Sequence, residues 1–352
     1  LKKWNKPQRV PTPIVTMPAK SLLMPEPLGV VLVIAPWNYP IQLLLVPAAG
    51  AIAAGNAVVM KPSEVSAATS AVLARLIPEY MDTKAVAVVE GGVPETTSLL
   101  AERYDHIFYT GNGTVGRIVM AAAAKHLASV TLELGGKSPV IVDNGADIEK
   151  IAADLAGAKQ FNGGQACISP DYVFIKEDQK TRLVEGFKAT VAQNLYDENG
   201  QIKKDSIAQI VNEANFNRVK ALFDDAVAQG ATVAVGGQMD ATDLTIHPTL
   251  LTDVTPQMKI LQEEIFAPVL PVMTYDTLDQ VIGYIEARDK PLALYMYSND
   301  DANVDKVLSH TSSGGVTING VFSHYLENRL PFGGVNQSGT GSYHGYFGFK
   351  AF

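Results

Sequence analysis

Cysteine is nearly absent from this sequence, whose 352 residues contain one, Cys167. A single thiol cannot form an internal disulfide, so a small disulfide-stabilised fold is excluded and a reducing compartment is favoured. We therefore expect a soluble, cytoplasmic protein. The thiol itself has either a chemical role or a packing role.

The sequence also has fewer basic than acidic residues. Lysine and arginine number 28 against 36 aspartate and glutamate residues, which gives a net charge of −8. The basic residues form no stripe or tail, so nucleic acid is not an expected partner. His, Cys, Asp and Glu do not cluster at metal-ligand spacing, and no metal is expected.

The sequence lacks an uninterrupted hydrophobic run of membrane-spanning length. Residues Leu28–Met60 carry no charge, and a spanning helix needs about 20 apolar residues. Prolines and amides interrupt this stretch, among them Pro36, Asn38, Pro47 and Asn56. Because the clear runs reach only about half a span, we expect no membrane span in this chain.

The chain does have the length and pattern of an α/β protein. Its length suggests about two domains at roughly 100–200 residues each, and a hydrophobic content of 47% is enough to form buried cores. Predicted strands of the first half are Leu28–Ala35, Ala57–Met60, Ala85–Val89, Asp105–Thr110 and Val130–Leu134. Predicted helices between them are Ile41–Gly55, Glu64–Tyr80 and Thr114–Lys125. A second series of strands and helices runs from Ser138 to Asn319, and this alternation predicts parallel sheets covered by helices.

The lone thiol lies in a glycine-containing segment, Asn162–Cys167 (NGGQAC). Paired glycines let a backbone approach another group closely. A free cysteine is most often a small buried hydrophobe, and a nucleophile is the alternative. Composition alone leaves both roles open.

Two polar residues follow predicted strands. Glu133 ends a strand that is otherwise apolar, where a carboxylate is costly unless it is paired or functional. Asn38 follows the first strand between two prolines, at the end of a strand where α/β proteins bind ligands. Its amide suits an oxyanion donor, and an Asx-turn is the structural alternative.

Two further turns have the composition of nucleotide-binding loops. Lys61–Glu64 (KPSE) places an ammonium, a hydroxyl and a carboxylate together, which suits ribose and phosphate. Gly111–Gly116 (GNGTVG) follows a strand, opens a helix and satisfies G-x-G-x-x-G. Taken literally, this fingerprint makes Glu133, about 20 positions on, the ribose ligand, which conflicts with a catalytic role for Glu133.

Taken together, these motifs resemble the signature blocks of the NAD(P)-dependent aldehyde dehydrogenase superfamily. Seven blocks carry the resemblance in order: the Asn38 turn, Lys61–Glu64, the Gly111 loop, Glu133–Gly136, Gly164–Cys167, Glu263–Pro268 and Pro331–Gly334. Pro170–Val173 and Gly341–Gly345 look like class 3 and its coniferyl- and fatty-aldehyde relatives. The resemblance covers essentially the whole chain, which looks truncated at both ends beside that family.

The resemblance implies an aldehyde dehydrogenase fold with four parts. These are a β-hairpin oligomerisation arm (residues 1–27), an NAD(P)-binding domain (28–135), a catalytic domain (136–334) and a C-terminal extended segment (335–352). The arm corresponds to two extended segments, Val10–Met17 and Ser21–Met24. A homodimer joined through it is implied.

The resemblance also implies oxidation of an aldehyde to a carboxylic acid with NAD or NADP. Cys167 would be the nucleophile, Asn38 the oxyanion donor and Glu133 the base for deacylation. The implied cofactor ligands are Lys61, Ser63 and Glu64 at the adenosine ribose, Gly111, Asn112 and Gly116 near the pyrophosphate, and Glu264 and Phe266 at the nicotinamide ribose. Medium-chain aliphatic or aromatic aldehydes are the expected substrates.

The sequence departs from the family pattern at two turns. Gly111-Asn112-Gly113 stands where relatives usually have Gly-Ser-Thr, and Asn336 stands where a glycine is usual. Asparagine tolerates the left-handed conformation, so the turn at Asn336 can survive.

Three alternative functions stay open. The first is transfer of the acyl group to coenzyme A, against which Glu133 argues. The second is a non-catalytic protein on the same scaffold, against which Cys167, Glu133 and Asn38 argue. The third is a conventional dehydrogenase that binds its cofactor at the Gly111 loop and uses no thiol.

Overall fold

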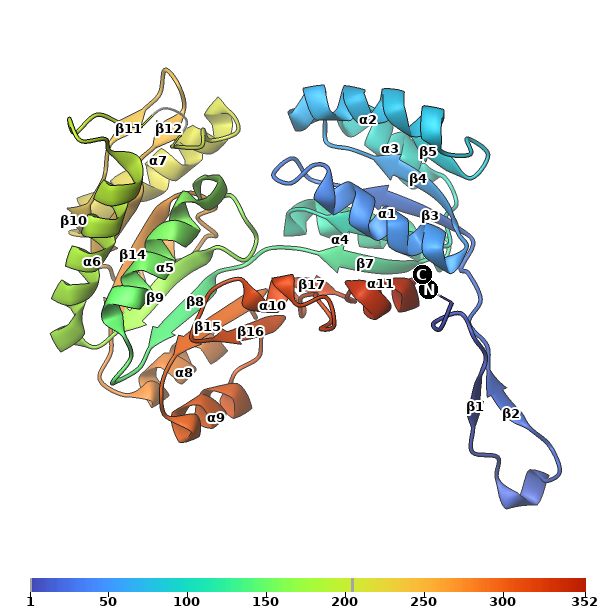
Figure 1. Cartoon of the computed structure of the whole chain (residues 1–352). Coiled ribbons are helices and arrows are strands. Elements are labelled where there is room, and N and C mark those ends of the chain that lie inside the picture. The colour runs from blue at the N-terminus through green and yellow to red at the C-terminus, as the bar shows by residue number, and fades with distance from the viewer. Residues whose placement is uncertain (1, 204–205) are drawn as a thin grey trace. The chain divides into compact units, whose positions relative to one another are not determined.

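The protein folds into two compact units, seen in a computed structural model that describes residues 2–203 and 206–352 (Figure 1). Unit 1 holds the chain up to Glu133 together with Asn328–Phe332 and Thr340–Phe352. Unit 2 holds Leu134–Glu327 and Gly333–Gly339. The chain therefore passes between the units four times, once directly after Glu133.

Unit 1 is built on a sheet with strand order β17-β7-β6-β3-β4-β5. The strands are β3 (Val30–Ile34), β4 (Ala57–Lys61), β5 (Val86–Val88), β6 (His106–Thr110), β7 (Ser129–Glu133) and β17 (Gly339–Thr340). The five strands β3 to β7 pair in parallel. All five side chains of β6 are buried, as in parallel strands covered on both faces. The predicted strands of this half are confirmed.

The helices of unit 1 are α1 (Gln42–Ala54), α2 (Ala67–Tyr80), α3 (Val93–Ala101), α4 (Gly113–Ala124) and α11 (Gly345–Ala351). The predictions for α1, α2 and α4 are confirmed to within a few residues. Helix α3 was missed because it buries one side chain, Leu100, and so shows almost no apolar periodicity.

The order of strands in unit 1 reverses at one point of the sheet. The chain runs outward from β3 to β4 and β5, then returns to the other side of β3 with β6 and β7. The direction reverses between β3 and β6, and open α/β sheets bind ligands beyond the carboxyl ends of strands at such a point. In the sheet register Ile34 pairs with both Lys61 and Tyr109, and Thr110 pairs with Glu133. These four strands therefore end within about one residue of each other.

Unit 2 is built on a sheet with strand order β10-β13-β14-β9-β8-β15-β16. Its strands are β8 (Ser138–Val142), β9 (Pro170–Ile175), β10 (Thr232–Val235), β13 (Thr249–Thr252), β14 (Val269–Thr274), β15 (Ala293–Tyr297) and β16 (Gly315–Ile318). All pairings are parallel except β10 with β13. This mixed sheet confirms the predicted α/β class.

Helices α5 (Ile148–Gln160), α6 (Glu177–Leu195), α7 (Glu213–Ala228), α8 (Leu278–Glu286), α9 (Asp301–His310) and α10 (Ser323–Leu326) complete unit 2. Strand β10 and the small hairpin of β11 (Met239–Asp240) and β12 (Thr245–Ile246) were not predicted. They are two to four residues long and mostly exposed or half-buried, so they carry little alternation. Among the described residues, no helix is long and apolar enough to cross a membrane.

The predicted arm is a hairpin of β1 (Gln8–Val10) and β2 (Ser21–Leu23) that extends away from the sheet of unit 1 (Figure 1). Its strands are shorter than the expected extended segments, because Ile14–Thr16 form a 3-10 turn at the tip. Leu1, the first residue of the predicted arm, lies outside the described residues. The tip is strongly apolar and exposed, with Ile14 at 84% and Val15 at 92%.

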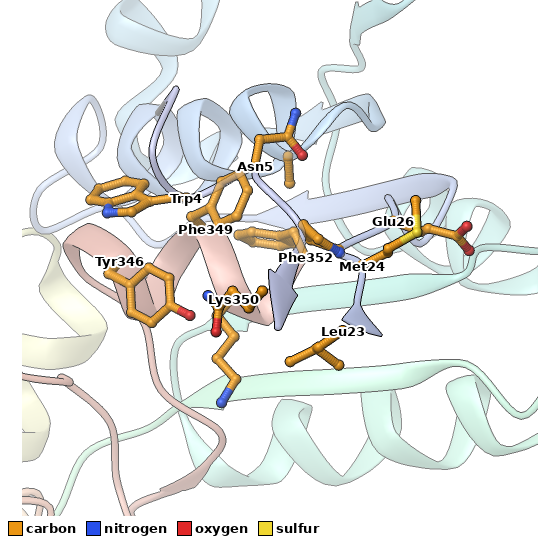
Figure 2. Close-up of a pocket in the computed structure, with 12 residues that line it drawn as sticks. Trp4, Asn5, Leu23, Met24, Glu26, Tyr346, Phe349, Lys350 and Phe352 are labelled. Carbon is orange, nitrogen blue, oxygen red and sulfur yellow. The ribbon is translucent and has the colours of Figure 1, made fainter. Parts of the chain in front are cut away.

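Residues 335–352, expected as an extended segment, include β17 and helix α11. Positive φ angles at His344 and Gly345 turn the backbone before the helix. The rings of Tyr346 and Phe349 in this helix each pack against Trp4 in a tilted arrangement, with ring centroids 5.7 Å apart. Figure 2 shows these rings lining a pocket where the two ends of the chain meet. Asn336 has a φ of 57°, so the expected left-handed turn is confirmed.

Candidate active site

A buried lysine marks the end of β4. Lys61 is 3% exposed, and its Nζ donates to the Pro62 carbonyl at 3.0 Å and to Glu64 Oε2 at 2.9 Å. Burial acts to raise the pKa of Glu64, but the hydrogen bond and charge of Lys61 outweigh it and lower that pKa. Ser63 accepts a hydrogen bond from the Val65 N–H at 3.3 Å and so caps the turn. The KPSE turn thus presents a half-exposed carboxylate beside a fixed ammonium.

The Gly111 loop follows β6 at the same edge. The Tyr109 hydroxyl donates to the Asn112 carbonyl at 3.3 Å and lies where a Cβ on Gly111 would be. A side chain at position 111 would therefore displace the tyrosine. Asn112 Oδ1 accepts from the Val115 N–H at 3.0 Å and caps α4. Gly116 lies buried inside α4, where a small residue allows close helix packing.

Asn38 lies in the loop between β3 and α1, half-buried, directly beyond the carboxyl end of β3. The next residue of the loop, Tyr39, accepts a hydrogen bond from the Leu43 N–H at 3.0 Å through its carbonyl, which joins the loop to α1. Asn38 therefore lies at the carboxyl edge of the sheet, beyond the first strand as predicted. It shares that edge with Lys61, Gly111 and Glu133.

Glu133 is the last residue of β7 and is 2% exposed. Both of its carboxylate oxygens are buried without a hydrogen-bond partner among the described residues. Burial in these surroundings raises the pKa of Glu133 well above its ordinary value. An unpartnered buried carboxyl group is energetically costly, and this is a common feature of functional sites.

In unit 2, Cys167 is held in a strongly bent loop. Asn162, Gly163 and Gly164 have φ angles of 51°, 60° and 69°, three left-handed residues in succession. A Cβ on Gly164 would collide with the Ala267 carbonyl, so this position requires glycine. Cys167 itself is half-buried between Ala166 and Ile168, which are both buried.

The side chain of Gln165 fastens this loop from inside. It is 3% exposed, donates to the carbonyls of Asn162 and Gln209, both at 3.0 Å, and accepts from the Val211 N–H at 3.0 Å. Sequence reasoning did not single out Gln165. These three hydrogen bonds join the Gln165 side chain to backbone groups, and they hold the loop before the thiol in one conformation.

A second loop of unit 2, Glu263–Pro268, carries Glu264 and Phe266. Three charged side chains hold it. Asp171 accepts from the Ile265 N–H at 3.0 Å, and Lys137 pairs with Asp171 and donates to the Glu263 carbonyl at 2.8 Å. Arg218 donates to the carbonyls of Glu264 and Ile265 at 3.0 and 2.8 Å. Lys137, Asp171 and Arg218 are further residues that sequence reasoning missed.

The Glu264 carboxyl group lies against Gly135, where any Cβ would collide with it. Burial and the nearby negative charge of Asp171 raise the pKa of Glu264 to about 8, against the opposing effects of the Gly136 N–H, Lys137 and Arg218. Phe266 has a φ of 50°, so the backbone of this loop is also bent into the left-handed region.

The structure thus gathers the predicted site residues into two groups. Within unit 1, Asn38, Lys61, Ser63, Glu64, Gly111, Asn112 and Glu133 lie along one edge of the sheet. Within unit 2, the loops of Cys167 and Glu264 touch through Gly164 and Ala267. Across the part of the chain that the structure describes, no group of three His, Cys, Asp or Glu residues is placed to hold a metal ion.

Comparison with known proteins identifies the family. The model of the aldehyde dehydrogenase family matches residues 3–352. A putative aldehyde dehydrogenase of Bacillus subtilis, AldX, is 50% identical over 352 residues, which are 100% of this chain and 79% of the relative. Aldehyde dehydrogenase family 3 member A2 of mouse is 47% identical over 96% of this chain and 69% of the relative.

A rat relative named "Aldehyde dehydrogenase, dimeric NADP-preferring" is 50% identical over 93% of this chain and 71% of its own length. Among solved structures, the substrate-bound state of Staphylococcus aureus AldH superposes with a TM-score of 0.94 at 42% identity, covering 100% of this chain and 76% of that one. The predicted fold, the class 3 resemblance and the enzyme class, an NAD(P)-dependent aldehyde dehydrogenase, are confirmed. This chain belongs to the aldehyde dehydrogenase family.

Proposed function

We propose that this protein oxidises medium-chain aliphatic or aromatic aldehydes to carboxylic acids, with Cys167 as the nucleophile. The observation that carries the proposal is the only thiol of the chain, half-buried in a loop fixed by three left-handed residues and by Gln165. Packing alone does not require so constrained a backbone at a cysteine. A nucleophile does, because a reacting atom must be held in one orientation.

In the first step the Cys167 thiolate adds to the aldehyde carbonyl. A carbon–sulfur bond forms, the carbonyl π electrons move to oxygen, and a tetrahedral thiohemiacetal results. The Asn38 amide would donate to the developing oxyanion, and one such donor is typically worth about 2.7–4 kcal/mol. The intermediate then collapses to a thioester as hydride leaves the carbon.

The nicotinamide cofactor supplies the acceptor for that hydride. The KPSE turn fits its adenosine ribose. Pro62 and Glu64 take two of the three Lys61 donors within the described chain, which leaves one for a ligand. The half-exposed Glu64 carboxylate suits the ribose hydroxyls of NAD, whereas Lys61 can accommodate the 2′-phosphate of NADP. We propose that both cofactors are used.

The remaining cofactor contacts would come from three places. Ser63 belongs to the same turn, and Gly111, Asn112 and Gly116 place the start of α4 beside the pyrophosphate, a favourable position for an anion. In unit 2, Glu264 and Phe266 would bind the nicotinamide ribose. The loop that carries them is braced by Asp171, Lys137 and Arg218.

Glu133 would act in the second half of the reaction. Its carboxylate takes a proton from water, the resulting hydroxide attacks the thioester, and the acid leaves as the Cys167 thiolate is restored. The raised pKa means that Glu133 must first lose its own proton, and the carboxylate then formed is a stronger proton acceptor than that of an ordinary glutamate. Acyl transfer to coenzyme A needs no such base, so the buried carboxyl group favours hydrolysis.

The proposed substrate class is supported by the apolar residue that follows the thiol and by two segments that the family resemblance assigns to the aldehyde site. Ile168 is buried beside Cys167, and Tyr39 and the segment Gly320–Leu326 would line the aldehyde site. These surfaces are apolar and aromatic, which favours medium-chain and aromatic aldehydes over small polar ones.

Replacing the nucleophile tests the proposal directly. Cys167→Ala should lower aldehyde oxidation by about 10⁴-fold or more, because the covalent step is lost. Cofactor affinity, measured by calorimetry with NAD and with NADP, should be unchanged because the thiol acts on the aldehyde. Wild-type turnover in this variant, assayed against aldehydes of different chain lengths, would refute the covalent mechanism.

The burial of Glu133 predicts a pH-dependent cost in stability. Since its pKa is raised in the folded protein, the native state holds a proton that the unfolded chain loses above pH 4.5, and stability falls as pH rises. Glu133→Gln removes this cost, so its gain in unfolding free energy should grow from pH 5 to pH 8. Each unit by which the pKa is raised corresponds to about 1.4 kcal/mol.

Thermal unfolding of both proteins at the two pH values measures this effect. Glu79→Gln, on the exposed end of α2, is the matched control and should change the melting temperature little at either pH. A stability difference between Glu133→Gln and the wild type that does not grow from pH 5 to pH 8 would contradict the prediction.

The arm predicts a homodimer. We expect the exposed side chains of Ile14 and Val15 to be buried in a subunit interface. In addition, a rat relative is named as dimeric. Light scattering at micromolar concentration should give twice the mass of 37.7 kDa. Val15→Asp should shift the protein toward monomer, whereas Leu127→Asp, equally exposed at 94% but outside the arm, should not. A wild-type monomer would count against the proposed dimer.

A further inference from the structure

A largely buried ion pair of unit 2 contacts the backbone on both sides of Glu264. Asp171 is 2% exposed, and its Oδ1 accepts a hydrogen bond from the Ile265 N–H at 3.0 Å. Its Oδ2 pairs with the Lys137 ammonium. The same ammonium donates to the Glu263 carbonyl at 2.8 Å. The chain is therefore held directly before and directly after Glu264.

Two neighbouring strands place this ion pair. Lys137 directly precedes β8, and Asp171 is the second residue of β9. The two strands pair in parallel, with Ser138 opposite Pro170. The Lys137 ammonium also donates to the Ile260 carbonyl at 2.8 Å, so each of its three hydrogens has a partner. The pair is thus fixed to the sheet of unit 2 and leaves no Lys137 donor for a ligand.

The Glu264 carboxyl group rests on the segment that carries Lys137. A Cβ built on Gly135, two residues before Lys137, would collide with the carboxyl group, and the three atoms nearest to it all belong to that group. Lys137 therefore fixes two things at once. It holds the backbone next to Glu264, and it belongs to the short segment against which the Glu264 carboxyl group lies.

These contacts fix a conformation more than they add stability. A buried ion pair seldom stabilises a protein in net terms, because desolvation offsets the attraction between its charges. The loop held by this pair is bent into the left-handed region at Phe266, with a φ of 50°. A bulky residue keeps such a conformation only when its surroundings impose it. The ion pair supplies part of those surroundings.

We propose that Asp171 and Lys137 are positioning residues for the cofactor, which hold the Glu264 carboxyl group over Gly135 in the orientation that binds the nicotinamide ribose. This inference rests on the proposed function, in which Glu264 is a ribose ligand. Asp171 is buried and Lys137 has no donor left, so both act through Glu264.

Removing the negative charge tests the inference. Asp171→Asn keeps the shape of the side chain and an acceptor for the Ile265 N–H, but it loses the pair with Lys137. It should raise both the KM and the dissociation constant for NAD about ten-fold, because Glu264 is no longer held in one orientation. The KM for octanal should not change. Calorimetry gives the dissociation constant without turnover.

Asp143→Asn is the matched control. Asp143 is also buried in unit 2, at 3% exposed, and its carboxylate accepts from Ser298 Oγ at 2.7 Å and from Asn303 Nδ2 at 2.9 Å. Both variants should unfold at a lower temperature than the wild type, because each weakens a buried network. Measured well below both melting temperatures, NAD affinity should fall in Asp171→Asn alone.

A double variant keeps the inference testable if Asp171→Asn does not fold. Lys137→Met combined with Asp171→Asn removes both charges and leaves no buried charge unpaired. It also removes the hydrogen bond to the Glu263 carbonyl, so NAD should still bind about ten-fold more weakly. Wild-type affinity for NAD in this double variant, or in a folded Asp171→Asn, overturns the inference.

A change at Gly135 should reproduce the effect without touching the ion pair. The φ of Gly135 lies outside the left-handed region, so alanine fits the backbone there and its Cβ acts by displacing the Glu264 carboxyl group. Gly135→Ala should raise the dissociation constant for NAD about ten-fold. Unchanged NAD binding in this variant would contradict the claim that the place of the carboxyl group over Gly135 matters.

Removing Glu264 separates positioning from a general structural effect. Glu264→Ala should itself weaken NAD binding about ten-fold or more, and adding Asp171→Asn to it should weaken binding no further. An undiminished effect of Asp171→Asn in the Glu264→Ala background overturns the inference. If Glu264→Ala binds NAD as the wild type does, Glu264 is not a ribose ligand, so that part of the proposed function is wrong and the inference fails with it.

Discussion

The close approach of Gly164 to the Ala267 carbonyl is the contact on which the arrangement of the two loops of unit 2 depends. A Cβ at position 164 would lie 2.4 Å from the Ala267 carbonyl oxygen, so the thiol loop and the Glu264 loop leave no room for a side chain between them. Everything proposed for unit 2 follows from this contact. Asp171, Lys137 and Arg218 fix the Glu264 side of it, and Gln165 fixes the thiol side. A larger residue at position 164 would move both loops at once.

Burying charged groups in this arrangement lowers the stability of the protein. Lys159 is fully buried, donates to the same Ala267 carbonyl at 3.1 Å, and burial lowers its pKa to about 8 even though Asp171 opposes the shift. Such groups rarely stabilise a protein in net terms, because desolvation offsets the attraction between them. Glu133 is a more extreme case in unit 1, with no partner for either oxygen within the described chain. Unit 1 therefore gives up stability at Glu133, a position that the proposed chemistry needs, as is common at active sites.

The sequence was enough to predict the parts of the site that end strands. Asn38, Lys61 and Glu133 each follow or end an apolar run, and the carboxyl ends of parallel strands meet at one edge. Residues that act through a distant partner could not be found this way. The Tyr295 hydroxyl meets a carbonyl 127 residues away, and Lys159 one 108 residues away. Each looks in the sequence like an ordinary core or helix residue. Helix α3 was missed for a similar reason, since its single buried leucine leaves no apolar pattern to read.

The central claim is that the reaction passes through a thioester on Cys167 that Glu133 helps to hydrolyse. Rapid mixing of Glu133→Gln with octanal and NAD tests it most directly, with intact-mass analysis of the quenched protein. The account predicts one burst of NADH per site, an octanoyl group on the single cysteine, and steady turnover about 10²–10⁴-fold below the wild type. Normal turnover at saturating NAD with a raised KM for NAD would contradict it, because Glu133 would then be a ribose ligand and the G-x-G-x-x-G loop a conventional dinucleotide fingerprint.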